Sequence, residues 1–145
     1  MFKVSKLFAV FVFVILSTLL FDIVTTYYAL LLPRFVWEHN PTVRWLFYYL
    51  GKEIGLMLWF FTWAAIYVAI LLFLDLSKFF ITEAAISAIM GFGHLLAGTS
   101  NFFICLNMLW LHFSLRGFLF DFWPFLLILL VPFSVIECYW KKRKE

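Results

Sequence analysis

Four long apolar runs dominate the pattern of hydrophobic and polar positions along this chain. They cover about residues 7–32, 45–74, 81–113 and 122–140, and shorter polar segments separate them. About 20 apolar residues cross the hydrocarbon core of a bilayer as a helix, which satisfies its own backbone hydrogen bonds there. The pattern therefore predicts an all-α, polytopic integral membrane protein. We expect a four-helix bundle in which residues 1–145 form a single transmembrane domain.

The third run is longer than a bilayer requires. A helix of about 33 residues extends about 50 Å, whereas the hydrocarbon core is about 30 Å thick. We expect this helix to tilt, protrude or break, with Gly91-Phe92-Gly93 as the place to bend. A re-entrant segment is the alternative. In the fourth run we expect any bend at Pro132.

Composition and charge support a membrane protein and argue against nucleic acid as a partner. Hydrophobic residues make up 66% of the chain and charged residues 13%, whereas a soluble domain carries about 25% charged residues. The net charge is +3, but four of the 11 basic residues lie together at positions 141–144. The basic residues therefore form no face that could bind nucleic acid.

The placement of lysine and arginine predicts the orientation in the membrane. With four spans, both termini and the link Asp75–Lys78 lie on one side. That side carries Lys3, Lys6, Lys78 and the basic residues at 141–144, and the other side carries Arg34, Arg44, Lys52 and Arg116. Because basic residues favour the cytoplasmic side, we expect both termini to lie in the cytoplasm. The expected location of the protein is the cell (plasma) membrane.

Asp22 is the charged residue of the first run. A carboxylate at the centre of a membrane helix costs about 2.5–3.5 kcal/mol on insertion scales. Thr18, Thr25 and Thr26 lie about one turn away on the same face, so we expect this face to point into the bundle. Two interpretations stay open: a structural carboxylate that joins helices, or one that binds a ligand, an ion or a proton.

Polar residues also occur between the first and second runs. Asn40-Pro41 has the pattern of a helix start, since Asn is a favoured N-cap and Pro a favoured first residue. Glu38 and His39 are not needed for such a cap and could serve a site. Lys52 near Asp22 would let both side chains stay charged and could bind an anionic headgroup. The alternative for Lys52 is a lysine that reaches the interface.

One face of the third run carries a polar stripe. At 100° per residue, His94, Asn101 and His112 lie within about 20° of the direction of Glu83. His94 and Asn101 are about 10 Å apart along the helix axis, and Glu83 is about 16 Å from His94. We expect this face to lie against the protein interior or a wet cavity, with His94 and Asn101 on either side of the depth of Asp22.

The common catalytic and redox motifs are absent from the sequence. It contains no His-Glu-x-x-His, Gly-x-Ser-x-Gly, phosphate loop or Cys-x-x-Cys. Cys105 and Cys138 form no disulfide framework, so we expect both to be free. The sequence identifies no cofactor and predicts no metal. If a metal is present, its expected ligands are Asp22, Glu38 and His94.

Asp22-x-x-x-Thr26, Glu38-x-Asn40-Pro41 and Lys52 together resemble an uncharacterised family of small polytopic membrane proteins, a domain of unknown function. That family has an Asp and a Thr in the first span, Glu-x-Asn-Pro in the next loop and a Lys entering the second span. The resemblance covers about the first third of the chain. It implies that these residues form one unit on the outer side, and it carries no activity.

These observations favour a small integral membrane protein without enzymatic activity, which binds a lipid, a small ligand or a partner subunit in an outer-half polar pocket. The expected site residues are Asp22, Thr26, Glu38, Asn40, Lys52, His94 and Asn101. The alternative is an intramembrane enzyme, metal-assisted or acid/base, that acts on a lipid or a membrane-embedded substrate. Asp22 or Glu38 would then be the base, with His94 as its partner. A third possibility is an ion or proton pathway in a homo-oligomer.

Overall fold

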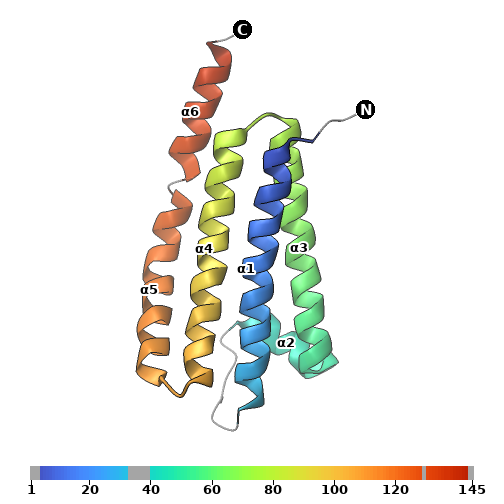
Figure 1. Ribbon diagram of the computed structural model, residues 1–145, viewed down its shortest axis with the longest axis vertical. Coiled ribbons are helices and arrows are strands. Elements are labelled where there is room, and N and C mark those ends of the chain that lie inside the picture. The colour runs from blue at the N-terminus through green and yellow to red at the C-terminus, as the bar shows by residue number, and fades with distance from the viewer. Residues whose placement is uncertain (1–3, 33–39, 129, 144–145) are drawn as a thin grey trace.

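The computed structural model describes residues 4–32, 40–128 and 130–143, with side chains described except at 119–127. Within these ranges the chain forms six α-helices and no strand (Figure 1). The predicted all-α class is confirmed for this part of the chain. The helices are α1 (Lys6–Leu31), α2 (Pro41–Leu50), α3 (Lys52–Leu76), α4 (Phe80–Cys105), α5 (Leu109–Ile128) and α6 (Leu130–Lys142).

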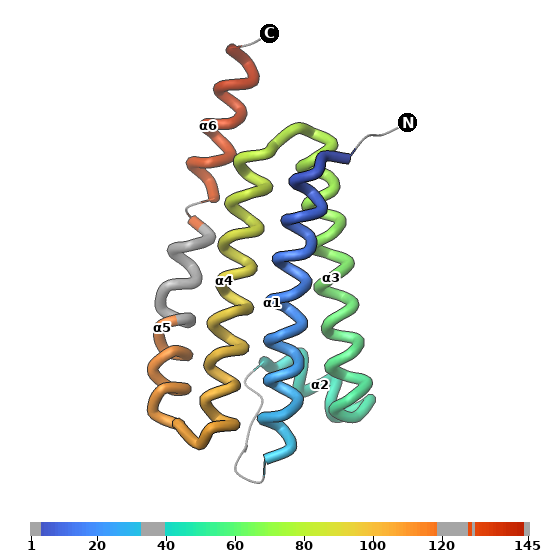
Figure 2. Tube along the Cα trace, viewed as in Figure 1, coloured from blue at the N-terminus to red at the C-terminus, as the bar shows by residue number. Residues whose placement is uncertain are grey.

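The helices α5, α4, α1 and α3 lie side by side with their axes roughly aligned (Figure 1). α6 continues past the end of α5, and the short α2 lies at the opposite end of the molecule (Figure 2). α1 packs against α3 and α4, while α4 also packs against α5 and α6. The start of α1, the α3–α4 link and α6 therefore gather at one end.

The hydrophobic core is small and lies mainly between α1 and α3. It includes Ile15, Leu19, Tyr67 and Leu71, while many large apolar side chains on the outer surface are exposed. α1, α3 and α4 are each long and apolar enough to cross a membrane. An apolar outer surface around a small core is what a lipid environment allows, because lipid tails solvate such side chains as well as a protein core does.

The predicted second span, 45–74, is two helices instead of one. Asn40 begins α2 as predicted: its Oδ1 accepts the backbone N–H of Thr42 at 3.0 Å and of Val43 at 3.3 Å. The helix then ends at Leu50, because Gly51 has φ +80°. Glycine adopts this conformation without the steric penalty of a Cβ, and α3 starts at the next residue.

The predicted third span, 81–113, is also wrong at its end. α4 stops at Cys105, and the chain reverses through a turn in which Asn107 has φ +61°. Asparagine tolerates the left-handed conformation better than most residues. Apolar residues continue on both sides of this turn, so hydropathy alone does not mark it. The expected bend at Gly91-Phe92-Gly93 does not interrupt α4, which continues through these residues.

The remaining predicted span, 122–140, is replaced by α5 and α6. α5 begins at Leu109, well before the predicted start, and ends at Ile128. Pro132 explains this end, because proline has no N–H to donate to the carbonyl of Ile128 and its ring crowds that carbonyl. The chain therefore returns along α4 in two helical pieces.

Candidate functional site

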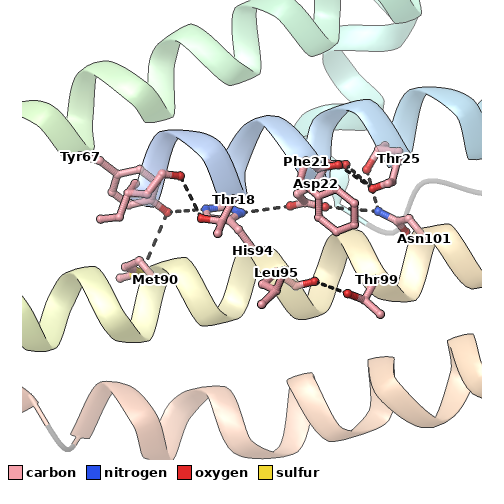
Figure 3. A network of polar contacts seen from close by, with 12 residues as sticks. Thr18, Phe21, Asp22, Thr25, Tyr67, Met90, His94, Leu95, Thr99 and Asn101 are labelled. Carbon is pink, nitrogen blue, oxygen red and sulfur yellow. Dashed lines mark hydrogen bonds and ion pairs between the residues drawn. The ribbon is translucent and has the colours of Figure 1, made fainter. Parts of the chain in front are cut away.

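The carboxylate of Asp22 lies between two polar side chains of α4 (Figure 3). Its Oδ2 is 3.0 Å from Nδ1 of His94, and its Oδ1 accepts a hydrogen bond from Nδ2 of Asn101 at 3.3 Å. His94 and Asn101 are seven residues apart, about two turns, and so share one face of α4. Each oxygen of Asp22 is therefore bound by a different turn of the same helix.

Tyr67 of α3 extends this network to a third helix. Its hydroxyl is 2.9 Å from Nε2 of His94, so both ring nitrogens of the histidine are engaged. With a neutral imidazole, Nδ1–H donates to Asp22 and Nε2 accepts from the Tyr67 hydroxyl. The result is a continuous polar chain from α3 through α4 to α1 (Figure 3).

Tyr67 is absent from the residues that the sequence suggested for the site. A signal was present, because it is the one tyrosine in the apolar stretch from Ile54 to Leu74. A buried tyrosine hydroxyl generally needs a hydrogen-bond partner. Aromatic contacts also position Tyr67: Trp63 lies between Trp59, in edge-to-face contact at a centroid distance of 5.6 Å, and Tyr67, in tilted contact at 5.5 Å.

Thr26 joins the network through Asn101. Its Oγ1 accepts a hydrogen bond from Nδ2 of Asn101 at 2.7 Å. Thr18 and Thr25, expected on the same face, instead donate to carbonyls of α1 itself. Of the three threonines near Asp22, Thr26 is therefore the one whose hydroxyl reaches across to α4.

A glycine allows α1 and α4 to approach this closely. A Cβ at Gly98 would lie 2.5 Å from the ring of Phe21 and 3.1 Å from Cα of Asp22. At Gly91, one heptad earlier, an added Cβ would meet Val14 and Thr18 at ordinary distances of 3.4 and 3.6 Å. The absence of a side chain at Gly98 thus lets Asp22 come close enough to α4 to contact His94 and Asn101.

The Asp22–His94 pair is not sealed from its surroundings. Each of these two side chains keeps 18% of its surface exposed, whereas Asn101 is 7% exposed. A carboxylate has about four lone-pair positions, and the described contacts to Asp22 occupy two of them. The pair can therefore accept further hydrogen bonds from a group that reaches it between the helices.

The structure does not bring every predicted site residue to Asp22. Lys52 Nζ donates to the carbonyl of Leu30 at 3.2 Å, and Leu30 is about 12 Å from Asp22 along α1. Lys52 thus joins the start of α3 to the end of α1, and the described ion pair of Asp22 is with His94. Asn40 caps α2. Glu38 and His39 lie outside the described residues.

The prediction that His112 belongs to the polar stripe of the third run is wrong, because α4 ends before it. His112 lies on α5, where its Nδ1 is 2.8 Å from Oγ of Ser100 and so links α5 to α4. Among the residues that the structure describes, no group of three His, Cys, Asp or Glu side chains could hold a metal ion. The suggested metal set includes Glu38 and falls partly outside this range.

Comparison with known proteins yields no relative. No protein-family model, curated protein or solved structure matches the chain. The chemistry of the site therefore rests on its own geometry. Cys105 and Cys138 are both free thiols, as expected.

Proposed function

We propose that this chain is a four-span integral membrane protein that binds a lipid, a small ligand or a partner subunit through the polar site around Asp22. α1, α3 and α4 supply three crossings, and α5 with α6 supplies the fourth. Both termini lie in the cytoplasm, on the side with more basic residues. Asp22 is past the middle of α1 toward α2, so the site lies in the outer half of the membrane.

The observation that carries this proposal is the partial exposure of the Asp22–His94 pair inside apolar segments. Keeping such a pair accessible is unfavourable unless another group completes its hydrogen bonds. The acceptor positions that the described contacts leave open lie on the carboxylate of Asp22. Its ligand is therefore a group that donates hydrogen bonds or carries positive charge, such as the ammonium of an amine headgroup.

The resemblance noted in the sequence supports the same site. Its two residues in the first span are Asp22 and Thr26, and both contact Asn101. The other residues of the resemblance follow α1 in the sequence. Glu38 belongs to the connecting segment, Asn40 precedes α2 and Lys52 begins α3. Asn40 caps α2 and Lys52 bonds to the carbonyl of Leu30, so of these three residues only Glu38 keeps a predicted part in the pocket.

The test is lipid retention by the purified protein. The protein is placed in nanodiscs of phosphatidylethanolamine and phosphatidylglycerol and released into native mass spectrometry. We expect the wild type to retain phosphatidylethanolamine and Asp22→Asn to lose most of that retention. Thr18→Val is the matched control, because Thr18 bonds only to carbonyls of its own helix in the described contacts. Equal retention by wild type and Asp22→Asn would contradict lipid binding at this site and leave a small ligand or a partner subunit as its occupant.

A second candidate function, a proton pathway, is favoured by the engagement of both ring nitrogens of His94. A proton taken up at Nε2 from the Tyr67 side makes an imidazolium, which then releases the Nδ1 proton to Asp22. The alternative of an intramembrane enzyme, with Asp22 or Glu38 as base and His94 as its partner, stays a prediction.

Proteoliposomes with a pH-sensitive dye inside separate the relay from simple binding. A relay predicts proton entry that is lost in Tyr67→Phe and in His94→Gln and kept in Thr18→Val. Tyr67→Phe is the sharper variant, because it removes one hydroxyl and leaves the Asp22–His94 pair in place. Wild-type liposomes that admit no protons would rule the pathway out.

A further inference from the structure

A second polar cluster lies at the other end of α4, near its start. Glu83 is fully buried, with 0% of its surface exposed. Within the described residues, the buried side-chain oxygens without a hydrogen-bond partner are Oε1 and Oε2 of Glu83 and Oδ1 of Asp75. An ionised carboxylate in this condition is unfavourable, since nothing replaces the water it has lost.

The two neighbouring carboxylates are stabilised differently. Glu137 of α6 accepts the backbone N–H of Ile81 at 3.0 Å, and both the N–H and the hydroxyl of Thr82 at 2.8 Å. These donors lie at the N-terminus of α4, where the helix dipole also favours a negative charge. Asp75 accepts the backbone N–H of Ser5 at 3.0 Å through Oδ2. Hydrogen bonds thus favour the anion at Glu137 and, with one donor, at Asp75, but not at Glu83.

The charged groups around Glu83 come from several elements. Asp75 of α3 and Glu137 of α6 both act on it electrostatically. Lys141 of α6 is engaged elsewhere, since its ammonium bonds the carbonyl of Ser77 and lies 3.4 Å from the centre of the Phe79 ring. The other described basic side chains toward this end are exposed: Lys6 of α1, Lys78 of the α3–α4 link, Lys142 of α6 and Arg143. The remaining described acidic, basic and histidine side chains of α1, α3, α4 and α5 lie farther along these helices: Asp22, Lys52, Glu53, His94, His112 and Arg116. The cluster is therefore rich in carboxylates.

We propose that Glu83 is a proton-binding site in the folded protein and that its O–H donates to Oδ1 of Asp75. One proton then serves two of the three described unpartnered oxygens: one oxygen of Glu83 becomes a donor, and Asp75 Oδ1 accepts its hydrogen bond. The other oxygen of Glu83 becomes a neutral carbonyl, which is less costly to bury than an ionised carboxylate oxygen. A carboxyl–carboxylate hydrogen bond of this kind is among the strong ones, because its acceptor is ionised.

This proton stabilises the packing of the helices at one end of the bundle. Asp75 holds the start of α1, and Glu137 holds α6 to the start of α4. Loss of the proton leaves three carboxylates, Asp75, Glu83 and Glu137, negatively charged where these elements meet. Their repulsion weakens the packing of α1, α4 and α6 at this end as the pH rises. The inference depends only on the Glu83 cluster and stands independently of the Asp22 site.

The first test is the pH dependence of unfolding in detergent, for wild type, Glu83→Gln and the matched control Glu53→Gln. Glu53 is an exposed residue of α3 at the opposite end. Over the pH range where the folded state keeps the proton and the unfolded state has lost it, stability falls as the pH rises. One proton changes the folding constant by about tenfold per pH unit.

Glu83→Gln carries a permanent neutral donor, so its stability should lack this one-proton decline, whereas Glu53→Gln should keep it. An identical pH dependence in wild type and Glu83→Gln would overturn the proposal. So would stabilisation of the wild type by Na⁺, K⁺ or Ca²⁺ at fixed pH that disappears in Glu83→Gln, because a cation would then occupy the place of the proton.

A second measurement does not need the variant to fold. Infrared spectroscopy of wild-type protein with ¹³C-labelled glutamate carboxyls should show a protonated carboxyl band at neutral pH, shifted by the isotope and by D₂O. Its absence while the protein is folded would equally overturn the proposal. The two readouts together separate a bound proton from a structural effect of the glutamine.

Discussion

At Asp22, a side chain that is expensive to keep within lipid receives hydrogen bonds from two residues of another helix. His94 and Asn101 each bind one of its oxygens, and Thr26 anchors Asn101 in turn. Tyr67 fixes the far side of the imidazole. Because each of these contacts depends on the next, the residues should behave as one unit in stability measurements.

Asn101→Leu tests this unit. The change removes two interhelical hydrogen bonds, and such bonds contribute about 0.6 kcal/mol each on average and up to about 1.7 kcal/mol. We expect a loss of about 1–2 kcal/mol in the free energy of unfolding, measured in mixed detergent. Thr99→Val is the control, since Thr99 donates to the carbonyl of Leu95 within α4 and should change stability little.

Coupling is measured by adding Thr26→Val. If the two side chains act together, the double variant should lose less stability than the sum of the single variants. Strict additivity would mean that the Asn101–Thr26 contact contributes nothing to folding.

At the scale of the helix, the packing of α1 on α4 decides whether the site forms. An added Cβ at Gly98 would be too close to the Phe21 ring and the backbone of Asp22. An added Cβ at Gly91 would lie at ordinary contact distances from α1. The two glycines are one heptad apart on the same helix face, so they form a matched pair that differs mainly in the space available.

Gly98→Ala should destabilise the protein and disturb the Asp22 site. The added methyl group meets the Phe21 ring and the Asp22 backbone, and overpacking of this kind typically costs about 1–3 kcal/mol. Gly91→Ala should be neutral or slightly stabilising, because Ala is the better helix former by about 1 kcal/mol. Unfolding midpoints of the two variants in the same detergent check this. A larger loss in Gly91→Ala would contradict the close approach at Gly98.

At the scale of the whole molecule, the arrangement has two distinct ends. The α3–α4 link, the start of α1 and the Glu83 cluster lie at one end, and α2 lies at the other (Figure 1). The proposed topology places the first end in the cytoplasm and the second outside. α4 contributes to both polar sites: Glu83 near its start belongs to the cytoplasmic cluster, and His94 and Asn101 farther along contact Asp22 in the outer half.

Cysteine labelling tests this topology. In a background without Cys105 and Cys138, Lys78→Cys and Tyr48→Cys each place one exposed thiol at opposite ends. We expect a membrane-impermeant maleimide to label Tyr48→Cys in intact cells and Lys78→Cys only after permeabilisation. Labelling of both from the same side would contradict the helix crossings, and the reverse pattern would invert the orientation.

Local signals made part of the fold predictable. Asn40-Pro41 predicted the start of α2, because a cap depends on the few residues that form it. The end of α4 at Cys105 was not predictable from hydropathy, since a single asparagine marks the turn within continuous apolar sequence. Likewise, helical spacing placed His94 and Asn101 on one face but could not say which helix they would meet.

The amino-acid sequence alone determined the helical class and the presence of apolar helices long enough to cross a membrane, because both depend on composition over one helix length. It also identified Asp22, Thr26, His94 and Asn101 as candidates. Beyond the start of α2, it did not determine where the helices after α1 begin and end. Only the tertiary structure decided that these four meet, that Tyr67 joins them and that Lys52 bonds to Leu30. Those outcomes depend on how closely and at what rotation two helices pack, and the space at Gly98 sets that approach between α1 and α4.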